Sequence, residues 1–201
     1  MTRNVCSRLL AMLFMTTALF AMVPAMSAES PKQMVERLGG SAVTILADPE
    51  VAPEERTQQF AVLFTRGFDL PLVARIVLGR YWRAATPEQQ TEYVDLFEEY
   101  VINTYANRLN SYAGQTLRIT GTNPISDNET MVNSVIEQPK GEPVKVDWRV
   151  LDRSGDLKIV DVLVEGVSMA ISQRSEFGAI IAKNGGDVEA LLVRLRPQNG
   201  K

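Results

Sequence analysis

The sequence predicts a single α+β domain over residues 29–201, with helices first, a four-stranded antiparallel meander next and helices last. Two observations carry this class. Apolar residues recur at helical spacing up to about Asn110, alternate with polar residues between Gln115 and Val164, and return to helical spacing from Ser168. The chain also shows no internal repeat and no linker-like stretch, which favours one domain.

Three helices are predicted in the first third of the chain. The segment from Pro31 to Asp48 has an apolar stripe, although Gly39 and Gly40 in its middle weaken or kink a helix. Pro53 and the two acids after it suit the first turn of a second helix. The third helix covers residues 70–78 and is apolar on most sides, which indicates burial or a wall around something apolar.

The fourth helix has the clearest start signal. Thr86 and Gln89 form a capping box, and Pro87 takes the first helical position. The helix is predicted to end near Asn110. One of its faces carries an aromatic stripe formed by Tyr93, Phe97 and Tyr100. Two interpretations of this stripe stay open, namely ordinary core packing and the wall of an apolar cavity, because both need the same residue types.

Four strands and two helices are predicted after Gly114. The strands cover residues 115–123, 129–138, 144–150 and 157–164. Pro124 is expected to end the first strand, and the alternation of the third predicts one solvated face. The last strand is apolar on both faces and is expected near the centre of the sheet. Helices are predicted from Ser168 to Lys183 and over residues 188–195.

Residues 1–28 have the organisation of a secretory signal peptide. Arg3 and Arg8 give a positive start, and the uncharged apolar run 9–23 is followed by small residues. The run is shorter than the roughly 20 residues of a membrane-spanning helix; an uncleaved anchor is the alternative. Export to a bacterial periplasm is therefore predicted, with cleavage that also removes Cys6, the only cysteine.

The composition excludes several chemistries. The chain contains no histidine and one cysteine, which rules out a Ser-His-Asp triad and argues against zinc clusters. The formal net charge is −3, without the basic excess that is typical of nucleic-acid binding. We therefore expect no enzyme, no cofactor, no metal site and no nucleic-acid partner.

The segment from Gly166 to Ala170 follows a predicted strand and opens a helix, as a nucleophile elbow does. Because no histidine is present to activate Ser168, we interpret this serine as a helix N-cap. Adjacent glutamate pairs, Glu54-Glu55 and Glu98-Glu99, point in different directions on a helix and are expected to be solvated.

Arginines gather in one stretch of the chain, as Arg66, Arg75, Arg80 and Arg83. Asp69 is the only acid between the first and the last of them. The forked, permanently charged guanidinium group suits phosphate. The stretch is interpreted either as a contact for a phosphate headgroup or an acidic partner, or as ordinary surface arginines.

Two blocks of sequence carry a resemblance. The first contains FDL at 68–70, GRYWR at 79–83, TPEQQ at 86–90 and TYA at 104–106. The second contains IVDV at 159–162, EGVS at 165–168 and RSEF at 174–177. In this order the blocks resemble the MlaC, or toluene-tolerance, family of periplasmic phospholipid-transport proteins.

The resemblance implies a soluble carrier whose helices and sheet enclose an apolar lipid cavity. Its implied role is to move phospholipid between an outer-membrane lipoprotein–porin complex and an inner-membrane ABC transporter complex, in support of outer-membrane lipid asymmetry. Three alternatives stay open: a hopanoid or another lipid as cargo, a periplasmic adaptor that binds only protein, and an enzyme that uses carboxylates on lipid or cell-wall substrates.

The resemblance also guides the choice of site residues. Arg80 and Arg83 are the candidates for the headgroup or for docking. The expected lipid-binding wall is Leu70, Val73, Ile76, Leu78, Tyr81, Phe97, Val101, Tyr105, Trp148, Val162, Val164, Met169 and Phe177.

Overall fold

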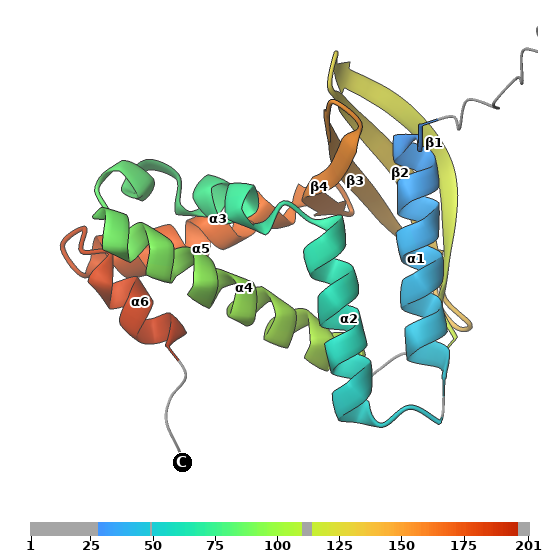
Figure 1. Ribbon diagram of the computed structural model, residues 1–201, viewed down its shortest axis with the longest axis horizontal. Coiled ribbons are helices and arrows are strands. Elements are labelled where there is room, and N and C mark those ends of the chain that lie inside the picture. The colour runs from blue at the N-terminus through green and yellow to red at the C-terminus, as the bar shows by residue number, and fades with distance from the viewer. Residues whose placement is uncertain (1–27, 49, 110–113, 197–201) are drawn as a thin grey trace, which may run out of the picture.

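A computed structural model describes residues 28–48, 50–109 and 114–196, and it has the predicted α+β architecture (Figure 1). The α-helices within these ranges are α1 (Pro31–Ala47), α2 (Pro53–Gly67), α3 (Leu70–Leu78), α4 (Pro87–Leu109), α5 (Met169–Lys183) and α6 (Glu189–Leu195). A short 3-10 helix, η1 (Gly79–Arg83), follows α3. The strands are β1 (Thr116–Ser126), β2 (Glu129–Glu137), β3 (Val144–Arg153), β4 (Asp156–Val164) and β5 (Val167–Ser168). The predicted signal peptide lies outside the described residues except for residue 28.

The helices form two groups around the sheet (Figure 1). Helices α1 and α2 lie side by side next to the sheet, whereas α3, α4, α5 and α6 pack together at the other end of the molecule. Helix α4 reaches from this second group to α2 and so connects the two. In the part of the chain that the structure describes, none of the helices has both the length and the hydropathy that a membrane crossing needs.

Side-chain caps mark the starts of α1 and α3. The Ser30 side chain accepts from the backbone N–H of Gln33, and the Gln33 side chain accepts from the Ser30 N–H, which completes a capping box for α1. The Asp69 carboxylate caps α3 by accepting from the N–H of Leu72. Helix α1 runs unbroken through its two central glycines.

The sheet has the order β1-β2-β3-β4-β5, and all its neighbouring strands are antiparallel. The prediction of four strands missed β5, which pairs only with the last two residues of β4. The expectation that β4 lies near the centre of the sheet was wrong, because β3 takes the central place and β4 has β3 as its strand neighbour along most of its length. The expectation that Pro124 ends the first strand was wrong, because β1 continues through it to Ser126. β1 lies at the edge of the sheet, where a residue without an N–H donor is tolerated.

The buried apolar residues within the described ranges form two clusters. One cluster joins α3, α4, α5 and α6 and includes Tyr93, Phe97 and Phe177. The other joins α1 to the sheet and includes Val35 and Val132. Members of both clusters line the same cavity, so the two clusters face each other across it.

The Tyr93 hydroxyl leads to a stability prediction. Tyr93 is 0% exposed, its hydroxyl has no hydrogen-bond partner among the residues that the structure describes, and burial raises its pKa. An unpaired buried hydroxyl is costly, so Tyr93→Phe is expected to raise the free energy of unfolding by about 1 kcal/mol in urea titrations. The control is Tyr100→Phe, whose hydroxyl donates to Gln173 Oε1 at 3.4 Å and should give no gain. A lower free energy of unfolding in Tyr93→Phe would contradict the interpretation that the Tyr93 hydroxyl is buried without a partner among the described residues.

Candidate apolar binding site

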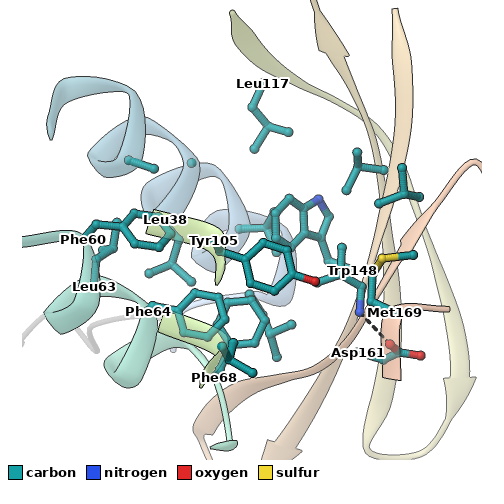
Figure 2. Close-up of a pocket in the computed structure, with 18 of the residues that line it drawn as sticks. Leu38, Phe60, Leu63, Phe64, Phe68, Tyr105, Leu117, Trp148, Asp161 and Met169 are labelled. Carbon is teal, nitrogen blue, oxygen red and sulfur yellow. Dashed lines mark hydrogen bonds between the residues drawn. The ribbon is translucent and has the colours of Figure 1, made fainter. Parts of the chain in front are cut away.

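An apolar cavity of about 490 Å³ lies between the helices and one face of the sheet (Figure 2). Helices α1, α2, α3 and α4, strands β1 to β4 and the start of α5 all contribute to its wall. This volume falls within the range of small-molecule sites in proteins, roughly 300–1,000 Å³. The cavity is thus large enough for a ligand.

Regular periodicity places the wall residues. Helix α1 contributes Val35, Leu38, Ala42 and Leu46, which recur every three or four residues and therefore share one helix face. Strands β3 and β4 each contribute a pair of alternate residues, because side chains two apart point to the same side of a sheet. The strand pairs are Val146 with Trp148 on β3, and Val162 with Val164 on β4.

Aromatic rings make up much of the wall near α2. Phe64 and Phe68 stack with ring centroids 4.0 Å apart, and Phe60 lies 5.8 Å from Phe64. The ring of Tyr105 on α4 also stacks with Phe64, and the centroids of these two rings are 6.3 Å apart (Figure 2). These aromatic side chains are only partly buried although they lie inside the fold, because they border empty space rather than a packed core.

Trp148 presents its ring to the cavity while its polar atom is satisfied elsewhere. The indole N–H donates to Ser134 Oγ at 2.9 Å, and that hydroxyl donates to the carbonyl of Val146 at 2.6 Å. Ser134 is 1% exposed, so this chain of hydrogen bonds is protected from water. The arrangement leaves only the apolar surface of the indole for a ligand.

Asp161 is the one charged side chain among the described residues that line the cavity. Its Oδ1 accepts from the backbone N–H groups of Val162 at 2.8 Å and Ala170 at 3.1 Å. Its Oδ2 accepts from the Ser168 hydroxyl at 2.6 Å. The carboxylate therefore lies at the N-terminus of α5, where the helix dipole stabilises negative charge.

Ser168 is the N-cap of α5, as the sequence predicted. Its Oγ accepts from the backbone N–H of Ile171 at 3.1 Å while its proton is donated to Asp161. Gln173, one turn into α5, also lines the cavity. Its amide nitrogen donates to Glu176 at 3.2 Å. These polar groups are engaged within the protein, and the contacts of Asp161 with Ser168 and Ala170 join β4 to the start of α5.

The structure brings together nine of the residues expected on the lipid-binding wall. They are Leu70, Val73, Phe97, Val101, Tyr105, Trp148, Val162, Val164 and Met169. Their contact with lipid remains a prediction. The expected set missed the contributions of α1 and α2, although the spacing of Phe60, Phe64 and Phe68 by four residues is a signal for a shared helix face.

Four residues expected on the wall lie elsewhere. Ile76, Leu78, Tyr81 and Phe177 are absent from the lining and pack in the cluster formed by α3 to α6. Phe177 is enclosed by aromatic rings of α4, with Phe97 at 6.4 Å and Tyr100 at 5.5 Å. Helix α3 is apolar on most sides, so one side faces the cavity and the other faces α4 and α5.

Arg80 and Arg83 are exposed and do not line the cavity. Both belong to η1, which joins α3 to α4 at the end of the molecule away from α1 and α2 (Figure 1). The Arg80 guanidinium donates to the Tyr81 hydroxyl at 2.8 Å and lies 4.8 Å from the centre of that ring. Neither arginine is placed to contact a ligand that stays within the cavity.

Comparison with known families gives one match that covers most of the chain. The family model described as MlaC protein matches residues 36–197. Among curated relatives, the Intermembrane phospholipid transport system binding protein MlaC of Haemophilus influenzae is 26% identical over 125 residues, which are 60% of this chain and 57% of that protein. The Toluene tolerance protein ttg2D of Pseudomonas putida is 24% identical over 114 residues, 57% of this chain and 53% of its own. The matches thus span little more than half of each relative.

A solved structure resembles the fold over a larger share of the chain. It is the phospholipid-binding protein from Ralstonia solanacearum, determined in complex with a phospholipid. The two folds agree with a TM-score of 0.74 at 27% sequence identity. The similarity covers 83% of this chain and 95% of that one.

Proposed function

This chain belongs to the MlaC family, and on that premise we propose that it is a carrier which binds a phospholipid by its acyl chains. The observation that carries the proposal is the cavity of about 490 Å³, whose wall is almost entirely aliphatic and aromatic. Asp161, the one charged side chain among the described residues of this wall, already accepts three hydrogen bonds from the protein. Such a wall suits hydrocarbon and offers little to a polar ligand.

The size of the hydrophobic effect explains why a carrier is needed. A two-chain lipid exposes roughly 30 methylene groups, at about 0.8 kcal/mol each, when it enters water. Release from a bilayer into water thus costs about 20 kcal/mol or more. A cavity with a hydrocarbon-like wall makes the transfer from bilayer to protein nearly neutral, so the carrier itself sets no direction of transport.

Direction is therefore proposed to come from partners. From the family resemblance, these are an inner-membrane ABC transporter complex, which ATP drives, and an outer-membrane lipoprotein–porin complex. The proposed location is the periplasm, after removal of residues 1–28. In this role the protein supports outer-membrane lipid asymmetry and is not an enzyme; the engagement of Ser168 and Asp161 in capping α5 supports that reading.

Native mass spectrometry of the purified protein, followed by solvent extraction and lipid analysis, tests the proposal. We expect one diacyl phospholipid per chain. A hopanoid or another lipid would keep the carrier function and change the cargo. A protein that is isolated without lipid, and that takes up none from vesicles of phosphatidylethanolamine and phosphatidylglycerol, would contradict the proposal and favour a protein-only adaptor.

Reversal of charge at η1 separates lipid binding from docking. Arg80→Glu/Arg83→Glu is expected to retain lipid at the wild-type level, because both side chains lie away from the cavity. The same variant should bind the membrane partner complexes more weakly if η1 is a docking surface. The measurements are lipid occupancy by native mass spectrometry and binding to the purified complexes.

The matched control for this variant is Lys32→Glu/Lys140→Glu, which changes the charge equally at two exposed positions. Loss of lipid in the arginine variant alone would place the headgroup near η1. Wild-type binding to both complexes would refute η1 as a docking surface.

A further inference from the structure

Two adjacent glycines in the middle of α1 have very different surroundings. Glycine is among the least favourable residues in the interior of a helix, so a close tertiary contact is the usual reason for a glycine at such a position. Apart from its chain neighbours and the nearby backbone of α1, none of the described residues lies within 4 Å of the position that a Cβ on Gly40 would take, and Gly40 is exposed. A Cβ on Gly39 would overlap Cδ2 of Leu117, and it would lie 3.4 Å from the Cβ and Cγ of that leucine.

The contact between Gly39 and Leu117 belongs to the cavity wall. Both residues line the cavity, and they meet where α1 crosses β1. Figure 2 shows Leu117 extending from its strand into the space beside α1. Leu117 also pairs in register with Ile136 of β2, another wall residue. The bare backbone of Gly39 therefore leaves room for a leucine that would otherwise occupy part of the cavity.

Helix α1 has little freedom to move away from β1 at this point. One turn earlier, Met34 and Val35 are 2% and 1% exposed and pack into the cluster that joins α1 to the sheet. Protein interiors are closely packed, so a side chain added at position 39 has to displace its nearest flexible neighbour. That neighbour is the end of the Leu117 side chain, and the empty space next to it is the cavity.

We propose that the contact between Gly39 and Leu117 determines how bulky a hydrocarbon chain the cavity accepts. This inference rests on the proposed carrier function and adds a specificity-determining pair to it. Gly39→Ala turns Leu117 into the cavity and selects against branched chains. Leu117→Ala widens the cavity and selects for them. The double substitution returns the selectivity toward wild type, because Leu117→Ala leaves only the Cβ atom at that position, 3.4 Å from the added methyl group.

A competition between two lipids of equal headgroup and equal main-chain length isolates the effect of bulk. The full protein is incubated with an equimolar mixture of dipalmitoyl and diphytanoyl phosphatidylglycerol in detergent micelles, and the bound fractions are read by native mass spectrometry. Relative to wild type, Leu117→Ala should raise the ratio of bound branched lipid to bound straight-chain lipid about fourfold or more. This factor corresponds to the burial of one additional methylene group. Gly39→Ala should lower the ratio by a similar factor, and the double variant should lie within twofold of wild type.

Gly40→Ala is the matched control, since it adds the same methyl group one residue away in open space. It should leave the lipid ratio unchanged. Ratios within twofold of wild type for both single variants, or a double variant that does not revert, would overturn the inference. If Gly39→Ala fails to fold, Leu117→Ala is compared with the double variant alone. A raised ratio in Leu117→Ala that reverts in the double variant would support the inference, and equal ratios in the two variants would overturn it.

A second measurement separates this inference from the proposed function. Urea unfolding of the lipid-free proteins should show that Gly39→Ala destabilises the chain that retains Leu117 and is tolerated in the Leu117→Ala background. Wild-type protein that binds neither lipid would contradict the proposed phospholipid cargo and the selectivity that rests on it. Equal destabilisation by Gly39→Ala in both backgrounds would overturn the contact itself.

Discussion

Val162→Glu is expected to empty the cavity of lipid while the fold stays intact. Val162 lies on β4, lines the cavity and pairs in register with Trp148 of β3. A carboxylate at this position would face acyl chains without a partner, which costs several kcal/mol. Since about 1.4 kcal/mol corresponds to a factor of ten, lipid affinity should fall about 100-fold or more. Without lipid, water in the cavity can hydrate the carboxylate, so folding is less affected.

The matched control is Val62→Glu. Val62 is 50% exposed on α2, so the same substitution there places the charge in water. Lipid occupancy by native mass spectrometry and folding by circular dichroism are measured for both variants. Val62→Glu should resemble wild type in both. Full lipid occupancy in Val162→Glu would mean that the bound lipid lies outside this cavity.

Phe97→Ala is expected to be the most destabilising single truncation among the cavity residues. Phe97 is 2% exposed and contacts Tyr93 and Phe177, with ring centroids 5.8 and 6.4 Å away. It also lines the cavity, so it closes the end that faces the α3–α6 cluster. Truncation of a buried phenylalanine costs about 3–5 kcal/mol, because contacts are lost and a void is left.

Urea unfolding measures this cost in the lipid-free protein. Val193→Ala is the control, since Val193 is 54% exposed on α6 and its truncation should change stability by less than about 0.5 kcal/mol. A loss near 1 kcal/mol for Phe97→Ala would show that the cavity relaxes around the missing ring. In that case the wall is more adaptable than close packing implies.

The sequence predicted most of the local structure because the signals for it are local. The capping box at Thr86 and Gln89 is present, with the Gln89 N–H at 3.3 Å from Thr86 Oγ1 and the Thr86 N–H at 3.1 Å from Gln89 Oε1. Ser168 caps α5, and Gly79 follows the last residue of α3. Three points were misjudged, namely the strand end at Pro124, the missed β5 and the central place expected for the last strand. All three depend on which strand lies at the edge of the sheet.

The binding site was harder to predict than the fold. Phe97 and Phe177 are both buried aromatic residues within helical patterns, yet only Phe97 lines the cavity. The arginines of η1 have the right chemistry for phosphate, but Arg80 lies on the surface away from the cavity wall. The sequence pattern shows whether each side chain is apolar, polar or charged, but it does not show how far that side chain lies from the cavity.

The sequence by itself determined the α+β order of elements, the N-terminal caps of α4 and α5, the absence of histidine chemistry and the excess of apolar helix surface. Periodicity and capping act within a few residues, so they can be read along the chain. Only the tertiary structure decided which apolar faces pack against one another and which border the cavity. The contact of Gly39 with Leu117 illustrates the reason, because it joins residues that are far apart in sequence and depends on the separation of α1 from β1.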